Sequence, residues 1–213
     1  MLPLVVKLRQ SGNWTPSSIV EFSLNSPAIQ PLQVQSELHR FAEIVHQLRP
    51  RSVVEIGTQH GGTLCVLSRL ADPCAKIVSV DLPGGEFGGG YKWFYAHIFK
   101  AFIYGQQSLH LIRGDSHSID TGTAVRDIVG WKCTLDLLFI DGDHSYEGVR
   151  EDFYSYSDLV RGGGIVAFHD IAEHTNQTCQ VARFWNEIKS QYRHEEIIAD
   201  KNQGWAGIGI LYI

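Results

Sequence analysis

The sequence has few cysteines and no excess of basic charge. Four cysteines are spread over the chain without any CxxC spacing, which argues against a zinc knuckle and against a disulfide framework. We therefore expect reduced thiols and a cytoplasmic protein. Acidic residues outnumber lysine and arginine by 23 to 18, whereas proteins that bind nucleic acid usually carry a basic excess. No nucleic-acid partner is expected.

Long apolar runs are also missing. No segment approaches the ~20 apolar residues that a membrane-spanning helix needs, and the apolar start at residues 1–7 is too short for a signal peptide, so we expect no membrane association. Hydrophobic residues nevertheless make up 44% of the 213 residues and charged residues 19%. That composition supports a sizeable core and excludes a disordered chain. The length and the absence of an interior linker fit a single main domain.

Short apolar runs alternate with helical patterns along most of the chain. Residues 1–32 contain four prolines and alternate only weakly, which predicts an irregular arm before a domain spanning residues 33–213. A helical pattern then covers residues 34–48 and ends before Pro50. The expected strands are residues 52–57, 76–81, 109–114, 137–141 and 164–170. The expected helices between and after them are residues 63–70, 91–104, 118–129, 146–160 and 179–191.

Five apolar strands that alternate with helices predict a parallel sheet covered on both faces, an α/β fold with a doubly wound, Rossmann-like sheet. Residues 194–199 and 206–212 are expected to close it as a terminal hairpin. Ligands bind such sheets outside the carboxyl ends of the strands. Six carboxylates and two imidazoles follow the strand ends here, a poor arrangement for stability unless something cationic lies among them. They are Glu55, Asp81, Asp115, Asp141, Asp143, Asp170, His144 and His169.

The first strand leads into a glycine loop and a helix at residues 55–63. Glycines such as Gly57 and Gly61 let the backbone approach a ligand closely, and the following helix presents free amides. The loop is not the dinucleotide fingerprint GxGxxG, because residue 59 is glutamine. A tight turn without a ligand is the alternative interpretation.

Asp81 and Asp115 end the second strand and follow the third. Asp81 lies 24 residues after Gly57, near the offset at which dinucleotide-binding folds place an acid on the ribose hydroxyls; an N-cap role is the alternative. Asp115 and Ser116 are suited to hold a base, but Ser116 or Ser118 is equally suited to cap the next helix.

Asp141, His169 and Asp170 combine carboxylate oxygens with one imidazole, a donor set that suits Mg²⁺ or Mn²⁺. His144 follows Asp141 by three residues. Its near-neutral pKa within a carboxylate cluster favours a proton-transfer role, with a capping or surface histidine as the alternative. The charged run at residues 150–152 is expected on the solvated face of its helix.

Residues 84–90 hold five glycines in seven positions and are followed by aromatic residues. This composition is typical of a mobile flap that closes over a ligand and excludes water. A flexible connection without that role is the alternative.

Taken together, these segments resemble the class I S-adenosylmethionine-dependent methyltransferases, and within them the group of the macrolide-sugar O-methyltransferases and cephalosporin-hydroxylase-like proteins. The resemblance runs from about residue 34 to the end. The segments that carry it are VVEIGTQHGGT (53–63), IVSVDLPGGEFGGGY (77–91), LIRGDS (111–116), LLFIDGDHSYEGVREDF (137–153) and GGGIVAFHDI (162–171). The fourth segment is fairly specific, and the ordered set is strong.

The resemblance implies a role for each of these residues. Glu55, Gly57 and Gly61 would surround the methionine part of S-adenosylmethionine, Asp81 would bind its ribose, and Asp115 with Ser116 its adenine. The set of implied cofactor-binding residues is completed by Thr63, Leu82 and Asp141. Asp141, His169 and Asp170 would hold the divalent metal, although His169 stands where the family usually has an acid. His144 would be the general base. A sheet of about seven strands with an antiparallel last strand is also implied.

The implied function is a metal-assisted O-methyltransferase that acts on a hydroxylated small molecule such as a sugar. One alternative is a nucleotide-dependent oxidoreductase. The sequence disfavours it, because GxGxxG is absent and no tyrosine is followed four positions later by lysine. Another is a non-catalytic cofactor-binding protein, because fold does not fix function. A hydroxylase activity lacks support from an iron facial triad. The proline-rich arm leaves a homo-oligomer open.

Overall fold

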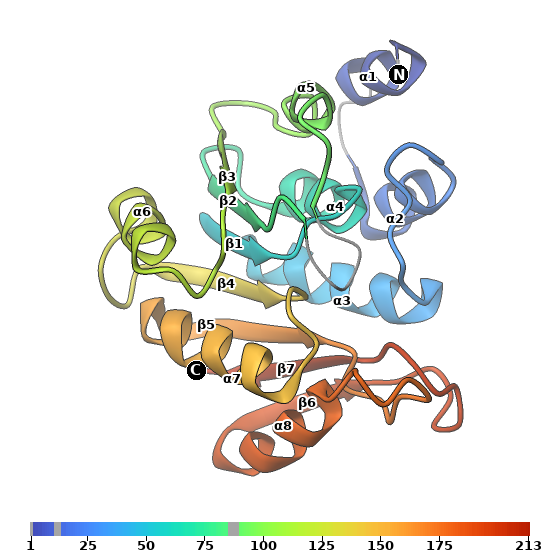
Figure 1. The fold of residues 1–213 in the computed structure, drawn as a ribbon. Helices are drawn as coiled ribbons and strands as arrows, with labels where there is room; N and C mark the ends of the chain where they lie inside the picture. The colour runs from blue at the N-terminus through green and yellow to red at the C-terminus, as the bar shows by residue number, and fades with distance from the viewer. Residues whose placement is uncertain (1, 11–13, 85–89) are drawn as a thin grey trace.

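The computed structural model describes residues 2–10, 14–84 and 90–213, which build a seven-stranded sheet with helices on both faces (Figure 1). The strand order is β3-β2-β1-β4-β5-β7-β6. Only β7 runs antiparallel to its neighbours β5 and β6. The fold class and the antiparallel last strand predicted from the sequence are therefore confirmed. The strands are β1 Ser52–Ile56, β2 Lys76–Asp81, β3 Ser108–Arg113, β4 Leu135–Ile140, β5 Val160–His169, β6 Arg193–Ile197 and β7 Ile208–Tyr212.

The helices begin where local capping chemistry favours them. Ser118 caps α6 by accepting a hydrogen bond from the backbone N–H of Thr121 (3.2 Å), and Ser145 caps α7 in the same way through Gly148 (3.0 Å). The α-helices are α1 Leu2–Gln10, α2 Pro16–Leu24, α3 Gln35–Leu48, α4 Gly62–Leu70, α5 Tyr95–Phe99, α6 Ile119–Val129, α7 Tyr146–Tyr156 and α8 Val181–Ile188. Two short 3-10 helices are η1 Ser157–Leu159 and η2 Lys189–Gln191.

The sheet separates two apolar layers. Within β1, Val53 packs into the layer formed with α2, α3 and α4, whereas Val54 packs into the layer formed with α6, α7 and α8. Both side chains are fully buried. A strand covered on both faces has no polar alternation, which explains why the central strands read as continuous apolar runs.

The prediction of an irregular arm over residues 1–32 is wrong for two parts of this segment, which form the helices α1 and α2. Thr15 and Ser18 form a capping box, with Ser18 N–H donating to Thr15 Oγ1 (3.2 Å) and Thr15 N–H donating to Ser18 Oγ (2.9 Å). Pro16 occupies the first turn, where its missing N–H costs nothing. The proline therefore starts a helix instead of preventing one, and α2 buries Ile19 and Val20 completely against the sheet's helical layer. The division of the chain at residue 32 stays a prediction.

Several element boundaries also differ from the sequence prediction. The helix expected over residues 91–104 shrinks to the five residues of α5, because aromatic packing takes precedence: Phe99 and Phe102 are fully buried and their ring centroids lie 5.3 Å apart. β5 begins earlier than expected, at Val160, and its register to β4 shifts between Leu135 and Leu137. Among the described residues, no helix has both the length and the hydrophobicity required to cross a membrane.

The packing of residues 29–31 against the start of α4 can be tested at Gly62. A Cβ at this position would lie 2.3 Å from the carbonyl oxygen of Ile29 and 2.4 Å from Cδ of Pro31. Gly62→Ala must therefore displace the segment, and we expect it to lower the free energy of unfolding by about 1–3 kcal/mol, measured by urea denaturation. The matched control is Gly162→Ala, whose Cβ would meet nothing within 4 Å. If both variants were as stable as the wild type, residues 29–31 would not be packed as described.

Candidate active site

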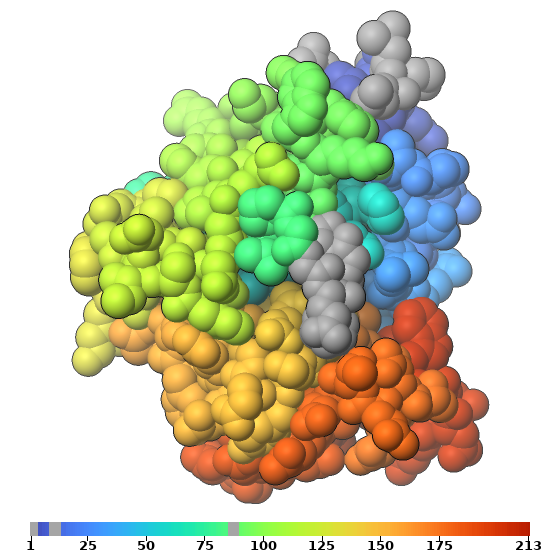
Figure 2. All heavy atoms as spheres, in the orientation of Figure 1, coloured from blue at the N-terminus to red at the C-terminus, as the bar shows by residue number. Residues whose placement is uncertain are grey.

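A cavity of about 740 Å³ lies at the carboxyl ends of β1 to β5. In Figure 2, the segments that follow β2, β4 and β5 (green, yellow and orange) come together on the face in view. Most residues singled out in the sequence line this cavity. They are Gly57, Thr63, Asp81, Leu82, Asp115, Ser116, Asp141, His144, His169 and Asp170. Glu55 and Gly61 are not among the lining residues.

Gly57 allows the loop after β1 to pass against the end of β4. Its φ is +87°, and a Cβ would lie 1.9 Å from the carbonyl oxygen of Asp141. Gly61 has a φ of +82° and begins α4, where a Cβ would meet the ring of Phe99 at 2.3 Å. Both glycines are therefore required by the tight turn, and Gly57 in addition forms part of the cavity wall.

Glu55 lies behind that wall. It is fully buried, and its Oε2 accepts a hydrogen bond from Thr58 Oγ1 (2.7 Å). Burial raises the pKa of Glu55 well above its usual value, and the nearby Asp141 and Asp81 raise it further. A hydrogen bond to Thr58 thus connects Glu55 to the cavity wall.

Asp81 joins two loops at the end of β2. Its Oδ2 accepts hydrogen bonds from the backbone N–H groups of Gln59 (3.0 Å) and Tyr91 (3.2 Å). Burial raises the pKa of this carboxyl group, against the effect of these amides. The observed partners belong to two different loops, so Asp81 is not an N-cap. Most of the predicted flap, residues 85–89, lies outside the described residues.

The loop after β3 contains both serines that the sequence offers as caps of α6. The cap is Ser118. Asp115 Oδ1 accepts from the backbone N–H of His117 (2.9 Å), and the carbonyl oxygen of Ser116 accepts from the Tyr156 hydroxyl (2.6 Å). These bonds fix the part of the loop that faces the cavity, and Ser116 has no capping role.

Asp152 was wrongly expected on a solvated helix face. It is fully buried, and its Oδ1 lies 3.2 Å from Nε2 of His117, which lines the cavity. The interaction with Asp152 raises the pKa of His117 to about 9. The run of three charges concealed this pair, because Arg150 and Glu151 beside Asp152 are exposed.

Asp141, His169 and Asp170 meet as the sequence predicts. Nδ1 of His169 lies 3.1 Å from Asp141 Oδ1 and 3.4 Å from Asp170 Oδ1. Burial alone would lower the pKa of His169, but the two carboxylates outweigh it and raise the pKa well above its usual value. Asp170 shows the reverse: burial would raise its pKa, yet His169 and His144 hold it well below its usual range. The histidines thus supply the positive charge at this edge.

The same three residues fit a divalent ion. One donor atom from each of them lies within 4.8 Å of the other two, so a small adjustment would bring all three around one ion. Two carboxylates and an imidazole form a donor set for a hard or borderline ion. The unusual His169 is therefore compatible with a metal site, and its side chain is almost fully buried.

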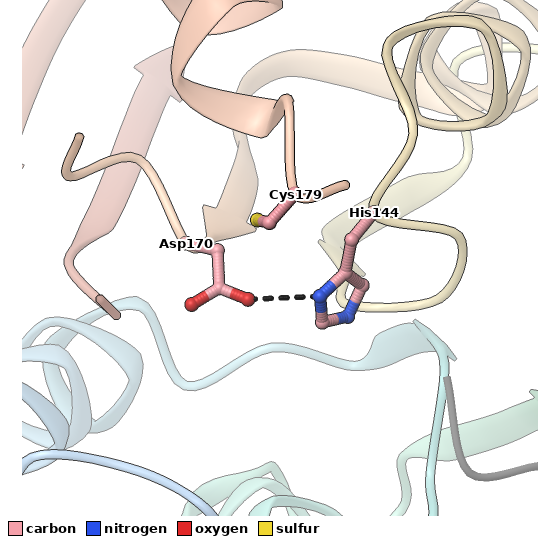
Figure 3. A group of neighbouring side chains, drawn as sticks. All are labelled: His144, Asp170 and Cys179. Carbon is pink, nitrogen blue, oxygen red and sulfur yellow. Dashed lines mark ion pairs between the residues drawn. The ribbon is translucent and has the colours of Figure 1, made fainter. Parts of the chain in front are cut away.

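His144 is neither a cap nor a surface residue. Its Nδ1 lies 3.0 Å from Asp170 Oδ2 (Figure 3). Its Nε2 lies 3.6 Å from Asp141 Oδ1. Burial opposes protonation, but Asp170, Cys179 and Asp141 raise the pKa of His144 to about 10. The alternative of a capping histidine is excluded, because Ser145 caps α7.

Further residues surround this cluster, of which only His174 is indicated by the sequence, through its closeness to Asp170. Gln33 Nε2 donates to Asp141 Oδ2 (3.4 Å), and His174 Nε2 lies 3.8 Å from Asp170 Oδ1. Trp205 lines the cavity from the loop before β7. No short motif marks Gln33 and Trp205, because they come from segments far from Asp170 in the sequence.

Comparisons with known proteins agree with this architecture. The family model described as "Methyltransferase domain" matches residues 54–171, more than half of the chain. The chain is 30% identical over 149 residues to the protein y4gI of Sinorhizobium fredii; the match covers 68% of this chain and 16% of that relative. The chain thus spans less than a fifth of this relative's length.

Two solved structures have the same fold. One is the O-methyltransferase TomG of Streptomyces achromogenes, involved in tomaymycin synthesis and in complex with SAM: 17% identity, TM-score 0.60, 96% of this chain and 92% of that chain covered. The other is CalS11, a TDP-rhamnose 3'-O-methyltransferase of calicheamicin biosynthesis: 17% identity, TM-score 0.59, with coverage of 99% and 92%. The resemblance to methyltransferases inferred from the sequence is confirmed: the chain belongs to the methyltransferase-domain family.

Proposed function

We propose that the protein is an S-adenosylmethionine-dependent O-methyltransferase that acts on a hydroxyl group of a small molecule. The observation that carries this proposal is the shared cavity, which joins the glycine loop at Gly57 and the acids Asp81 and Asp115 to the acid–imidazole cluster around Asp170. Its volume of about 740 Å³ lies within the roughly 300–1,000 Å³ of small-molecule and cofactor sites.

The cofactor is assigned along the ends of β1, β2 and β3. The loop at Gly57 and the start of α4 at Thr63 offer close backbone approach and a helix terminus to the methionine part. Asp81 accepts from the ribose hydroxyls at the second strand end. Asp115 and Ser116 hold the adenine, and Leu82 and Asp141 complete the binding set. The S-adenosylmethionine present in the TomG structure supports this assignment.

Methyl transfer from a sulfonium is an in-line displacement, so the site must align sulfur, methyl carbon and acceptor oxygen. His144 is the proposed general base, because it lines the cavity and is oriented by Asp170 at 3.0 Å. It takes the hydroxyl proton as the oxygen–carbon bond forms. Without a bound cation, Asp170 and Asp141 raise the pKa of His144 to about 10, so its ring keeps its own proton. A neutral base thus requires that their charge be balanced.

Asp141, His169 and Asp170 are the proposed ligands of a divalent metal, either Mg²⁺ or Mn²⁺. Their donor atoms are close enough to share one ion, and the imidazole favours the more nitrogen-tolerant Mn²⁺. Such an ion would act as a Lewis acid that lowers the pKa of a chelated hydroxyl and orients it. Gln33 would hold the outer oxygen of Asp141, which its side chain already contacts.

The acceptor is assigned to the part of the wall formed by Leu32, His174, Thr178 and Trp205. Three segments far apart in the sequence provide it, and they combine an aromatic ring with hydroxyl and imidazole groups. These groups suit a hydroxylated ring such as a sugar, and the TDP-rhamnose substrate of CalS11 supports that class. The cytoplasmic location and a homo-oligomer stay predictions of the sequence.

Cofactor binding is the first test. In isothermal titration calorimetry the protein should bind S-adenosylmethionine and its demethylated product but not NADH. Asp81→Asn should lower the affinity for both S-adenosylmethionine and its demethylated product by about 10- to 100-fold, because a hydrogen bond to a charged group contributes about 1.5–3 kcal/mol. Asp158→Asn changes a half-exposed acid that does not line the cavity and should bind normally. Selective binding of NADH would instead favour the oxidoreductase.

The role of His144 is tested by separating turnover from binding. His144→Ala should lower the turnover number by about 10²–10⁴-fold, while the affinity for the demethylated cofactor changes less than about twofold. His39→Ala, at an exposed position of α3, serves as control. If His144→Ala turned over at the normal rate, His144 would not be the general base. A wild type that binds cofactor without methylating any of a panel of polyols would favour the non-catalytic alternative.

Metal binding is measured without reference to turnover. Electron paramagnetic resonance should show that the protein removes one equivalent of free Mn²⁺ from solution. Asp141→Asn should weaken this binding by about tenfold or more, because loss even of a supporting group at a metal site typically costs 10- to 100-fold. Asp158→Asn is again the control. Equal Mn²⁺ binding by the wild type and Asp141→Asn would show that the metal is held elsewhere or not at all.

A further inference from the structure

A second group of possible metal ligands lies beside the first. His144, Asp170 and Cys179 each offer one ligand atom, and these atoms lie within 4.8 Å of one another. Figure 3 shows that the three side chains come from three segments and face a common region. Cys179 has no place in the transfer reaction proposed above, and the sequence pattern singles it out only as a reduced thiol.

We propose that His144, Asp170 and Cys179 form a site for a thiophilic divalent ion such as Zn²⁺ or Cd²⁺, distinct from the Asp141–His169–Asp170 site, and that occupation of this site blocks methyl transfer. The inhibitory part of this proposal rests on the proposed role of His144 as base. The binding part does not depend on it.

The donor chemistry separates the two sites. Zinc binds thiolate, imidazole and carboxylate at about 2.0–2.3 Å in a tetrahedron, which places neighbouring ligand atoms about 3.3–3.6 Å apart. The three ligand atoms lie within 4.8 Å of one another, with His144 Nδ1 3.0 Å from Asp170 Oδ2, which is near the spacing of such an arrangement. The group with Asp141 and His169 has no sulfur and suits a harder ion. Binding at Cys179 would release its thiol proton.

Asp170 belongs to both groups and can serve each with a different oxygen. Its Oδ1 faces His169 at 3.4 Å, whereas its Oδ2 faces His144 at 3.0 Å. The carboxylate is also fixed, because the backbone N–H of Ala206 donates to Oδ1 (2.9 Å). Three protein ligands leave a fourth position for water or substrate, the usual arrangement of a zinc site that is open to ligands.

The backbone holds the cysteine close to the histidine. The N–H of Gln180, next to Cys179, donates to the carbonyl oxygen of His144 (2.7 Å). The N–H of Cys179 itself donates to the carbonyl oxygen of Asn176 (3.1 Å). The segment before α8 is thus tied to the loop before α7, so the ligand atoms are held near one another before any ion binds.

Cys65 provides the contrast expected of a cysteine with a packing role only. It is fully buried within α4, and burial raises the pKa of its thiol to about 12. No described histidine, acid or cysteine joins it in a group of metal ligands. Cys65 is therefore the matched control for Cys179.

Metal coordination would prevent the imidazole of His144 from acting as a general base. An ion held by Nδ1 occupies a lone pair, and its charge disfavours protonation of the same ring. Hydroxyl activation by this histidine is then lost. Zinc should inhibit the enzyme, whereas Mg²⁺ or Mn²⁺ at the neighbouring site should not.

The test uses the full chain carrying Cys74→Ser and Cys133→Ser, which removes the two exposed thiols, in a phosphine reductant. Cd²⁺ is titrated while the ultraviolet thiolate-to-metal charge-transfer band is recorded. One equivalent of Cd²⁺ should produce the band, Cys65→Ser should keep it, and Cys179→Ser should lose it. His144→Ala should weaken the binding by about tenfold or more. Cys179→Ala serves as second variant if the serine variant does not fold.

The absence of the band, or its persistence in both Cys179 variants, overturns the site. Zn²⁺ is then added during turnover. Inhibition that disappears in Cys179→Ala supports the full proposal, and a band without inhibition overturns its inhibitory part. If the protein transfers no methyl group even without zinc, the proposed function fails, while the Cd²⁺ band still decides whether the site exists.

Discussion

The charge pairing around Asp170 governs this site. A carboxylate that is almost fully buried lies between the imidazoles of His144 and His169, and a buried charge without a partner is strongly destabilising. Each group therefore constrains the protonation of the others: the acid stays ionised because the histidines are cationic, and the histidines stay cationic because the acids are ionised. Chemistry in the cavity has to begin from this balance, which any bound cation would shift.

The sheet explains why such a cluster forms. Parallel strands deliver all their carboxyl ends to one edge, so residues that follow β1, β2, β4 and β5 meet although they are far apart in sequence. Gly57 makes the meeting close, because the backbone after β1 lies against the carbonyl of Asp141 with no room for a side chain. The same packing leaves Glu55 behind the wall, where it supports Thr58. The close contact between Gly57 and the carbonyl of Asp141 thus accompanies a division of roles, in which Thr58 lines the cavity and Glu55 supports it from behind.

The sheet and most of the site could be predicted because both depend on local patterns. Apolar runs that end in Asp81 or Asp141 mark strand ends directly, and one topological rule brings them together. The burial of Asp152 could not be predicted, since its exposed neighbours make the run look solvated. The helix that begins at Pro16 could not be predicted from the number of prolines, because a proline in the first turn starts a helix instead of breaking it. The position of Cys179 depends on a loop conformation, which no periodicity encodes.

The short segment from Pro31 to Gln33 belongs to two structures at once. It packs on the start of α4, where Gly62 has no space to spare, and it also forms part of the cavity wall, with Gln33 contacting Asp141. A change in this segment would therefore alter both the packing of α4 and the cavity wall beside Asp141. In the proposed function, acceptor selectivity would then depend in part on residues that lie outside the sheet altogether.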